Sequence, residues 1–199
     1  QAHSDTDKLM PLIHLPVQSG SNKILKSMNR KHTIEEYLQL IDRLKKINPL
    51  IKFSSDFIIG YPGETDKDFE DTLKLLKEIK YINSYSFIFS PRPGTPASTL
   101  REIDINISKE RLSIFQKKAD EIKMKYKEEL VNNNSLVLFE NKTIGKNKFF
   151  GRDEYSNSVI VKSNKNIIGK IAQVKITNGN RNTLFGEINH NEEKKNFAA

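Results

Sequence analysis

Cysteine is absent from the 199-residue sequence, which excludes a disulfide framework and any metal site or cluster held by thiolates of this chain. The sequence also lacks an apolar run near the roughly 20 residues that a membrane-spanning helix requires. No basic segment followed by an apolar stretch stands at the amino end, so no signal peptide is expected. We therefore expect a cytoplasmic protein that does not enter a membrane.

Several catalytic signatures are missing as well. No His, Asp or Glu cluster has the spacing of a metal site, no serine stands in a nucleophile elbow, and no phosphate-binding Walker pattern is present. The motifs alone therefore predict no catalytic residue and no metal ligand in this chain. Because the first residue is Gln1 and not methionine, we expect a segment cut from a longer protein.

Positive charge is in excess, with 33 basic and 25 acidic side chains giving a formal charge of +8. Residues 1–131 hold 22 basic and 19 acidic groups, whereas residues 132–199 hold 11 and 6 in about half the length. This distribution favours binding of a polyanion such as nucleic acid by the C-terminal part. A lysine-rich surface that only keeps the protein in solution is the alternative.

The first two-thirds of the sequence alternates strands with amphipathic helices, a pattern typical of parallel βα units. Two capping boxes, Thr33 with Glu36 and Thr65 with Asp68, predict helix starts. The first of these helices should end at Asn48, before a proline, and a long helix should open at Ser108. Further elements are expected as strands at 12–17, 51–59 and 84–90 and as a helix at 21–29.

Each predicted strand has one polar and one apolar face, which a doubly wound sheet, apolar on both sides, would not show. The pattern fits a TIM-like βα barrel with a partly wet interior and helices outside. Three strands cannot close such a barrel, so we expect a partial one. The polar face is assigned to His14, Ser54, Asp56, Ser84 and Ser86, and the apolar face to Phe53, Phe57, Tyr85, Phe87 and Phe89.

After a run of asparagines at 132–134 the pattern changes to five short strands without helices. They are expected at 135–140, 148–152, 158–163, 171–177 and 183–188. This spacing favours a small all-β, OB-like barrel. The predicted division is a partial barrel over 1–131, a β-barrel over 134–190 and a flexible tail over 191–199.

The three predicted parallel strands end in "PVQSGS", "IIGYPGE" and "SPRPGTP", all rich in Gly, Pro and Ser. Loops at the C-terminal ends of barrel strands build active sites. Asp56 could accept a hydrogen bond from a ribose hydroxyl or pair with a lysine, and Arg30 could bind a carboxylate or complement a helix end. His14 could carry a proton or hydrogen-bond inside the barrel. Ordinary turn chemistry is the alternative for each loop taken alone.

Longer motifs identify a family. "HLPVQSGSNKILKSMNRKHTIEEY", "SSDFIIGYPGET" and "SYSFIFSPRPGTPA" resemble the second half of the radical S-adenosylmethionine methylthiotransferases. "FFGRDE" and "IIGKIAQVKIT" resemble their C-terminal TRAM domain, an RNA-binding β-barrel. The segment Tyr85-Ser86-Phe87 and the "PRPGTPA" loop favour the members that thiomethylate isopentenylated adenosine in tRNA over those that act on a ribosomal protein.

The resemblance implies a site for S-adenosylmethionine. Ile58 and the stretch from Gly60 through Gly63 to Glu64 match the strand-end motif that packs against the cofactor's adenine. Gln18 and Ser19 match positions that face its ribose and methionyl part, and Arg30 matches an arginine near its carboxylate. For the TRAM-like part, the resemblance and the charge together imply tRNA binding by Lys148, Arg152, Lys170 and Lys175.

The sequence departs from this family in one respect. The family reaction uses two 4Fe-4S clusters held by cysteines, and this chain has none. The resemblance therefore implies a C-terminal portion that is inactive alone, with a separate N-terminal half carrying the cluster cysteines. A non-catalytic tRNA-binding module, a remnant of a split gene and an unrelated barrel enzyme are the alternatives. Because a partial barrel exposes strand edges, residues 1–131 should be less stable than the β-barrel predicted over 134–190, or should associate.

Overall fold

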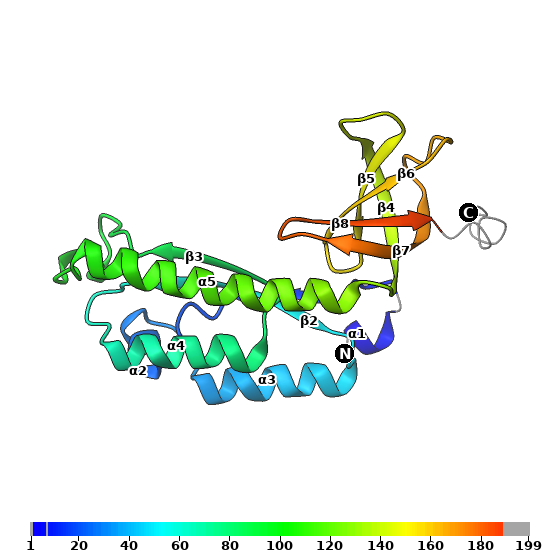
Figure 1. Ribbon diagram of the computed structural model, residues 1–199. Helices are drawn as coiled ribbons and strands as arrows, with labels where there is room; N and C mark the ends of the chain where they lie inside the picture. The colour runs from blue at the N-terminus through cyan, green and yellow to red at the C-terminus, as the bar shows by residue number, and fades with distance from the viewer. Residues whose placement is uncertain (1, 7, 189–199) are drawn as a thin grey trace. The chain divides into compact units, whose positions relative to one another are not determined.

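The computed structural model describes residues 2–6 and 8–188, and the expected tail at 191–199 lies outside them. The described residues form two compact units, one built from 2–6, 8–9 and 13–123, the other from 10–12 and 124–188. The elements (Figure 1) are α1 Ala2–Asp5, β1 Leu12–His14, α2 Asn22–Ser27, α3 Ile34–Ile47, β2 Lys52–Ile59, α4 Asp66–Ile79, β3 Asn83–Ile88, the 3-10 helix η1 Pro96–Thr99, α5 Ile105–Leu130, β4 Asn134–Lys142, β5 Lys148–Asp153, β6 Ser158–Lys162, β7 Ile171–Gly179 and β8 Thr183–Ile188.

The first unit contains a three-stranded sheet in the order β1-β2-β3, with β2 and β3 parallel. One face of β2 carries Phe53, Phe57 and Ile59, which pack with apolar side chains of α3, α4 and α5 into one core. In Figure 1, α3 and α4 run alongside β2. The α/β class is confirmed. The described strands of this unit form an open three-stranded sheet, and the assignment of this sheet to a partial TIM-like barrel stays a prediction.

The start signals of two helices are confirmed. Thr33 Oγ1 accepts a hydrogen bond from Glu36 N, and the Glu36 carboxylate accepts one from Thr33 N. Thr65 and Asp68 form the same reciprocal pair at the start of α4. Each pair satisfies two amide groups that have no partner within the helix.

Several element boundaries differ from the sequence-based expectation, and two of them have a clear local cause. The first strand ends at His14 and not at 17, and beyond it only an isolated bridge joins Gln18 to Phe57. Pro16 has no amide hydrogen to continue the ladder. The long helix begins at Ile105 and not at Ser108, because the Asp104 carboxylate accepts a hydrogen bond from Asn106 N at 2.7 Å.

The face assignment of the third strand was wrong. The parallel register places Tyr85 beside Asp56 and Phe87 beside Ile58, so these two aromatic residues share the face of His14 and Asp56. Ser84 and Ser86 lie on the helix-covered face with Phe57 instead. Tyr85 and Phe87 are 53% and 59% exposed. The uncovered face of this sheet is therefore partly aromatic.

The second unit holds a closed five-stranded barrel, as the sequence predicted, and its strand order is β4-β5-β6-β8-β7. All neighbours are antiparallel except β6 and β8, which are parallel. Gly151 of β5 faces inward, where an added Cβ would stand 2.4 Å from the Leu138 carbonyl oxygen. The barrel core consists of Val137, Phe139, Phe149, Val159, Val161, Ile167, Val174, Ile176, Leu184 and Ile188.

None of the helices in the described ranges is long and apolar enough to cross a membrane.

Candidate functional site

The first unit contains a cleft of about 690 Å³ at the ends of β2 and β3. Its walls come from both strands, from the loop after α2, and from the loop that leads into η1. Strand ends of a parallel sheet are where ligands bind in α/β proteins. The lining residues are Gln18, Ser27, Met28, Asn29, Arg30, Asp56, Ile58, Tyr61, Phe87, Ile88, Phe89, Ser90, Arg92, Thr95, Pro96 and Ala97.

Four of the predicted cofactor residues meet in this cleft, namely Gln18, Arg30, Asp56 and Ile58. Gln18 is held on the β2 edge by two backbone hydrogen bonds, from its own N to the Asp56 carbonyl and from Ile58 N to its carbonyl. Its φ of 76° lies in the left-handed region, which is uncommon for a residue other than glycine. The segment that carries Gln18 is therefore fixed against the neighbouring strand.

Asp56 belongs to a polar cluster on the uncovered sheet face. His14 Nε2 lies 3.4 Å from Asp56 Oδ2, and His14 Nδ1 lies 2.9 Å from Ser54 Oγ. The Tyr85 ring meets the His14 ring edge-on at 6.1 Å. These contacts orient the Asp56 carboxylate without burying it, so it can still accept a hydrogen bond from a ligand hydroxyl.

The other four predicted cofactor residues do not line the cleft. Ser19 is buried, accepts a hydrogen bond from Ser21 N and lies 3.4 Å from Thr72 Oγ1 of α4. Gly63 has a φ of +81° and no atom within 4 Å of the place of an added Cβ.

Gly60 and Glu64 have structural partners. The φ of Gly60 is +73°, and an added Cβ there would stand 2.3 Å from Ser108 Oγ, so the space beside this glycine is taken by α5. The Glu64 carboxylate accepts a hydrogen bond from Gly60 N and forms an ion pair with Arg111 Nη1 at 2.7 Å. Burial raises the pKa of Glu64, and the Arg111 guanidinium opposes that rise. The loop 60–64 is thereby tied to α5.

Sequence reasoning missed several lining residues. Tyr61 donates a hydrogen bond from its hydroxyl to the Ser27 carbonyl and packs edge-on against Phe89. Phe87 was assigned to the wrong face, and the register that places it beside Ile58 is not visible in the alternation. Arg92 was named only within the "PRPGTPA" motif. The sequence did offer one indication for Arg92, because it lies in the loop after the third predicted parallel strand, where βα barrels place active-site residues.

The cleft combines an aromatic and aliphatic wall with one carboxylate and two guanidinium groups. Ile58, Phe87 and Phe89 offer surface to a flat ring, while Arg30 and Arg92 can pair with a carboxylate. Asp56 can accept from hydroxyls. This set suits a ligand that joins a nucleoside to an amino acid.

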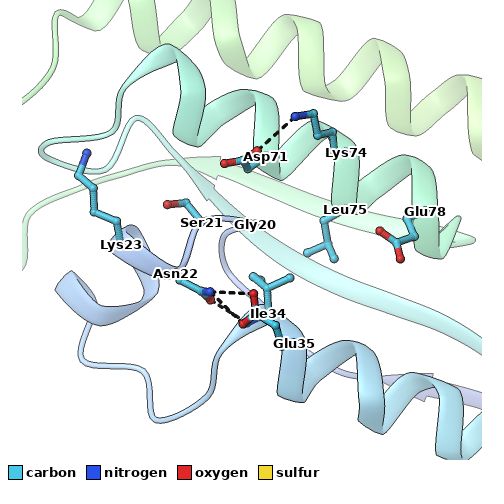
Figure 2. A pocket seen from close by; sticks show the side chains of 10 residues that line it. All are labelled: Gly20, Ser21, Asn22, Lys23, Ile34, Glu35, Asp71, Lys74, Leu75 and Glu78. Atoms are coloured by element: carbon cyan, nitrogen blue, oxygen red, sulfur yellow. Dashed lines mark hydrogen bonds and ion pairs between the residues drawn. The ribbon is translucent and has the colours of Figure 1, made fainter.

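A second pocket, of about 430 Å³, lies between the loop 20–23, the start of α3 and the outer side of α4 (Figure 2). Its charged groups largely satisfy one another. The Asn22 amide donates to the Glu35 carboxylate at 2.9 Å, and Lys74 lies 3.5 Å from Asp71. No aromatic side chain lines it. It is therefore the weaker candidate for a ligand site.

Across residues 2–6 and 8–188, no group of three or more His, Asp or Glu side chains is placed to hold a metal ion. The residues present, which include no cysteine, do not fit an iron–sulfur cluster.

The predicted RNA-binding residues are spread over the barrel. Lys148 and Arg152 lie on the outer face of β5, and the Arg152 guanidinium lies 5.5 Å from the Phe150 ring centre. Lys175 of β7 stands opposite Glu187 of β8. The Lys170 carbonyl accepts a hydrogen bond from Phe139 N, just before β7.

Comparison with known proteins defines the class first. Residues 6–76 match the model of the Radical SAM superfamily, and residues 130–188 match that of the TRAM domain. Proteins named tRNA-2-methylthio-N(6)-dimethylallyladenosine synthase are 54% identical over 193 residues in Pelagibacter ubique (strain HTCC1062), 49% over 190 in Rickettsia akari (strain Hartford) and 46% over 189 in Wolbachia pipientis wMel.

These three alignments cover 97%, 94% and 93% of this chain and 43% of each relative. The chain therefore carries a Radical SAM region followed by a TRAM domain, is similar to these synthases along nearly all of its length, and spans less than half of theirs.

Proposed function

We propose that this chain is the C-terminal portion of a tRNA methylthiotransferase that adds a methylthio group to isopentenylated adenosine beside the anticodon. The observation that carries the proposal is the cleft in which Gln18, Arg30, Asp56 and Ile58 converge. The 54% identity to the tRNA-2-methylthio-N(6)-dimethylallyladenosine synthase of Pelagibacter ubique supports the reaction and substrate. Because the substrate is a tRNA, we place the protein in the cytoplasm.

The cleft fits S-adenosylmethionine by the chemistry of its lining. In this proposal Ile58 packs on the adenine, Asp56 accepts from a ribose hydroxyl, and Arg30 pairs with the methionyl carboxylate. Bound S-adenosylmethionine supplies the methyl group and the radical precursor of the reaction. Gly60 and Glu64 contribute indirectly, because they fix the loop that carries Tyr61 into the cleft wall.

The chain would not catalyse the reaction alone, since it has no thiolate for a cluster. We infer that an N-terminal half with the cluster cysteines completes the partial barrel and covers the exposed face of Tyr85 and Phe87. Parallel sheets are normally covered on both faces, which supports a covering segment of this kind.

Cofactor binding is tested by calorimetric titration of the full chain with S-adenosylmethionine. Asp56→Asn should weaken binding about 10-fold, because a hydrogen bond to a charged group is replaced by one to a neutral group. Asp71→Asn is the matched control, because Asp71 lies in the second pocket and not in the cleft. Equal affinities of both variants would remove the cleft from consideration.

The activity is tested by mixing the chain with a separately produced N-terminal half and an isopentenylated anticodon stem-loop RNA. Methylthio product should form only in the mixture after iron–sulfur reconstitution. Stoichiometric cluster uptake by the chain alone would contradict the proposal.

A non-catalytic tRNA-binding module is the second candidate, because the barrel closes within this chain and residues 134–188 hold nine basic and four acidic side chains. It predicts tRNA affinity that falls with salt, and a smaller salt dependence in Lys148→Gln or Lys170→Gln. Unchanged affinity after these charge removals would reject it.

A further inference from the structure

The outer face of three neighbouring barrel strands carries a row of apolar side chains. Residues that are paired between adjacent strands point to the same side of a sheet. Phe150 of β5 pairs with Ile160 of β6, and Ile160 pairs with Phe185 of β8. Figure 1 shows these strands within the barrel. We name Phe150, Ile160 and Phe185 the outer row.

The outer row is not part of the barrel core. Its side chains alternate with the buried Phe149, Val159 and Leu184, which point inward on the same three strands. Phe185 is 36% exposed, and Phe150 and Ile160 are half-buried. Two aromatic rings are thus available on the surface of a small barrel whose interior is already filled.

Basic side chains flank the row on both sides. The Arg152 guanidinium lies 5.5 Å from the ring centre of Phe150 and pairs only loosely with Glu140, at 3.6 Å. On the other side Lys148 of β5 stands directly opposite Lys162 of β6. Like charges that are directly opposite in a sheet are destabilising, and an anion bound between them would relieve the repulsion.

We propose that the outer row is a stacking platform for unpaired bases of RNA, with Lys148, Lys162 and Arg152 contacting the phosphates. This inference rests on the proposed RNA binding by the barrel and specifies its surface. Aromatic side chains beside basic groups are the means by which proteins bind single-stranded RNA. Phe150 and Phe185 are two strands apart, roughly 10 Å, so each ring can take its own base.

The platform predicts that the four basic residues named from the sequence contribute unequally to RNA affinity. Lys148 and Arg152 flank the outer row, whereas Lys175 faces Glu187, whose carboxylate offsets its charge. We therefore expect Lys148 and Arg152 to contribute more to RNA affinity than Lys175. Lys162, which the sequence did not single out, should contribute as much as Lys148.

The test uses the full chain and an adenine-rich RNA of about 12 nucleotides, within the site size of such barrels, with one fluorescent 2-aminopurine. Base stacking should quench its fluorescence on binding. Phe150→Leu and Phe185→Leu keep an apolar side chain but remove the ring, and each should weaken binding roughly 5- to 150-fold without changing the salt dependence. Leu136→Ala, at an exposed outward position of β4, is the control and should bind normally.

The charge variants separate this inference from RNA binding in general. Lys162→Gln should lower the slope of log affinity against log salt by about 0.7, the value for one lost phosphate contact on a single strand. One outcome is that the chain binds RNA and that the charge variants weaken this binding. If both Phe→Leu variants then keep the RNA affinity and the fluorescence quenching of the unchanged protein, the platform is wrong but the RNA function stands. If no RNA binds at all, both fail.

Two further results decide the matter. The same RNA annealed to its complement should bind more weakly, because its bases are no longer accessible; equal binding of the duplex would overturn the platform. If the Phe→Leu variants change the sedimentation of the protein and not its RNA affinity, the row is a protein interface and the inference is wrong.

Discussion

The two units of the chain differ in whether their sheets have free strand edges and exposed faces. In the barrel every strand has two neighbours, and the order β4-β5-β6-β8-β7 closes on itself, so no edge is left for another chain to pair with. In the first unit the sheet β1-β2-β3 has two edges, and among the described residues helices pack against one of its two faces. Its other face exposes Tyr85 and Phe87.

This difference separates a closed barrel from a sheet that, among the described residues, has helices on one face and an exposed second face. The barrel closes with residues of this chain alone, so the proposed RNA binding would need no further segment. The first unit has a cleft wall and an anchored loop, but the face that carries Asp56 and His14 has no covering layer in the described chain.

The largest expected effect comes from deleting one buried aromatic ring in each unit. Phe57 is fully buried and its ring contacts those of Tyr81 and Phe115, so Phe57→Ala should destabilise the first unit by about 4 kcal/mol. Phe139→Ala should do the same to the barrel. Denaturant unfolding followed by hydrogen exchange should show one unit lost and the other retained. Simultaneous loss of both units in either variant would contradict independent stability.

A somewhat smaller effect is expected at the ion pair that ties loop 60–64 to α5. Arg111→Met leaves the buried Glu64 carboxylate without its partner and should cost about 3 kcal/mol at neutral pH. Because burial already raises the pKa of Glu64, protonation should relieve this cost as the pH falls toward that pKa. Thermal unfolding between neutral pH and about pH 4 measures the recovery. The double variant with Glu64→Gln should lose less than Arg111→Met alone, and an equal or larger loss would reject the explanation.

The next largest loss of stability, about 2 kcal/mol, is expected when the charge of Asp68 is removed. Asp68 links the loop 19–23 to the start of α4 through hydrogen bonds. Burial raises the pKa of Asp68, but hydrogen bonds from Lys23, Ser21 and Thr65 outweigh burial and hold it well below its usual range. Its stabilisation is therefore present above the unfolded-state pKa of about 4, and it is lost as the pH falls toward the lower folded-state pKa.

Asp68→Asn should consequently destabilise the first unit at pH 7, and the difference from the unchanged protein should shrink below about pH 4. Denaturant midpoints at several pH values provide the measurement. Asp71→Asn serves as a comparison, since its pairs with Lys67 and Lys74 lie at the surface and should contribute under 1 kcal/mol. A pH-independent difference for Asp68→Asn would show that its charge is not what stabilises the loop.

The sequence predicted the elements well where local rules decide them. The barrel strands alternate with a period of two and are separated by turn residues, and β8 was predicted with the bounds Thr183–Ile188 that it has. Thr33 and Thr65 begin helices because the capping box is formed by residues three apart. These signals need no knowledge of the tertiary structure.

Prediction failed where register and function compete with the hydrophobic pattern. In β3 the polar serines lie on the helix-covered face, and Tyr85 and Phe87 lie on the other face, where Phe87 lines the cleft, so alternation alone assigned the faces in reverse. The side chain of Ser84 is buried without a hydrogen-bond partner, a cost that no pattern reveals. Gly60 likewise suggested space for a ligand, and only the fold shows that Ser108 of α5 takes that space.

The smallest effect on stability is expected on the uncovered face of the first unit. Tyr85 is 53% exposed, and Tyr85→Thr keeps a strand-forming residue while removing an exposed ring, so the free energy of unfolding should change by less than about 1 kcal/mol. Self-association of the chain should nevertheless weaken roughly 10-fold, because the uncovered face loses apolar surface. Sedimentation velocity over a concentration series measures this, and Ile114→Thr on α5, at a similarly exposed position, is the control. Equal association of the two variants would mean that the open sheet face does not attract a covering partner, and the contrast between the two units would then lie in their strand edges alone.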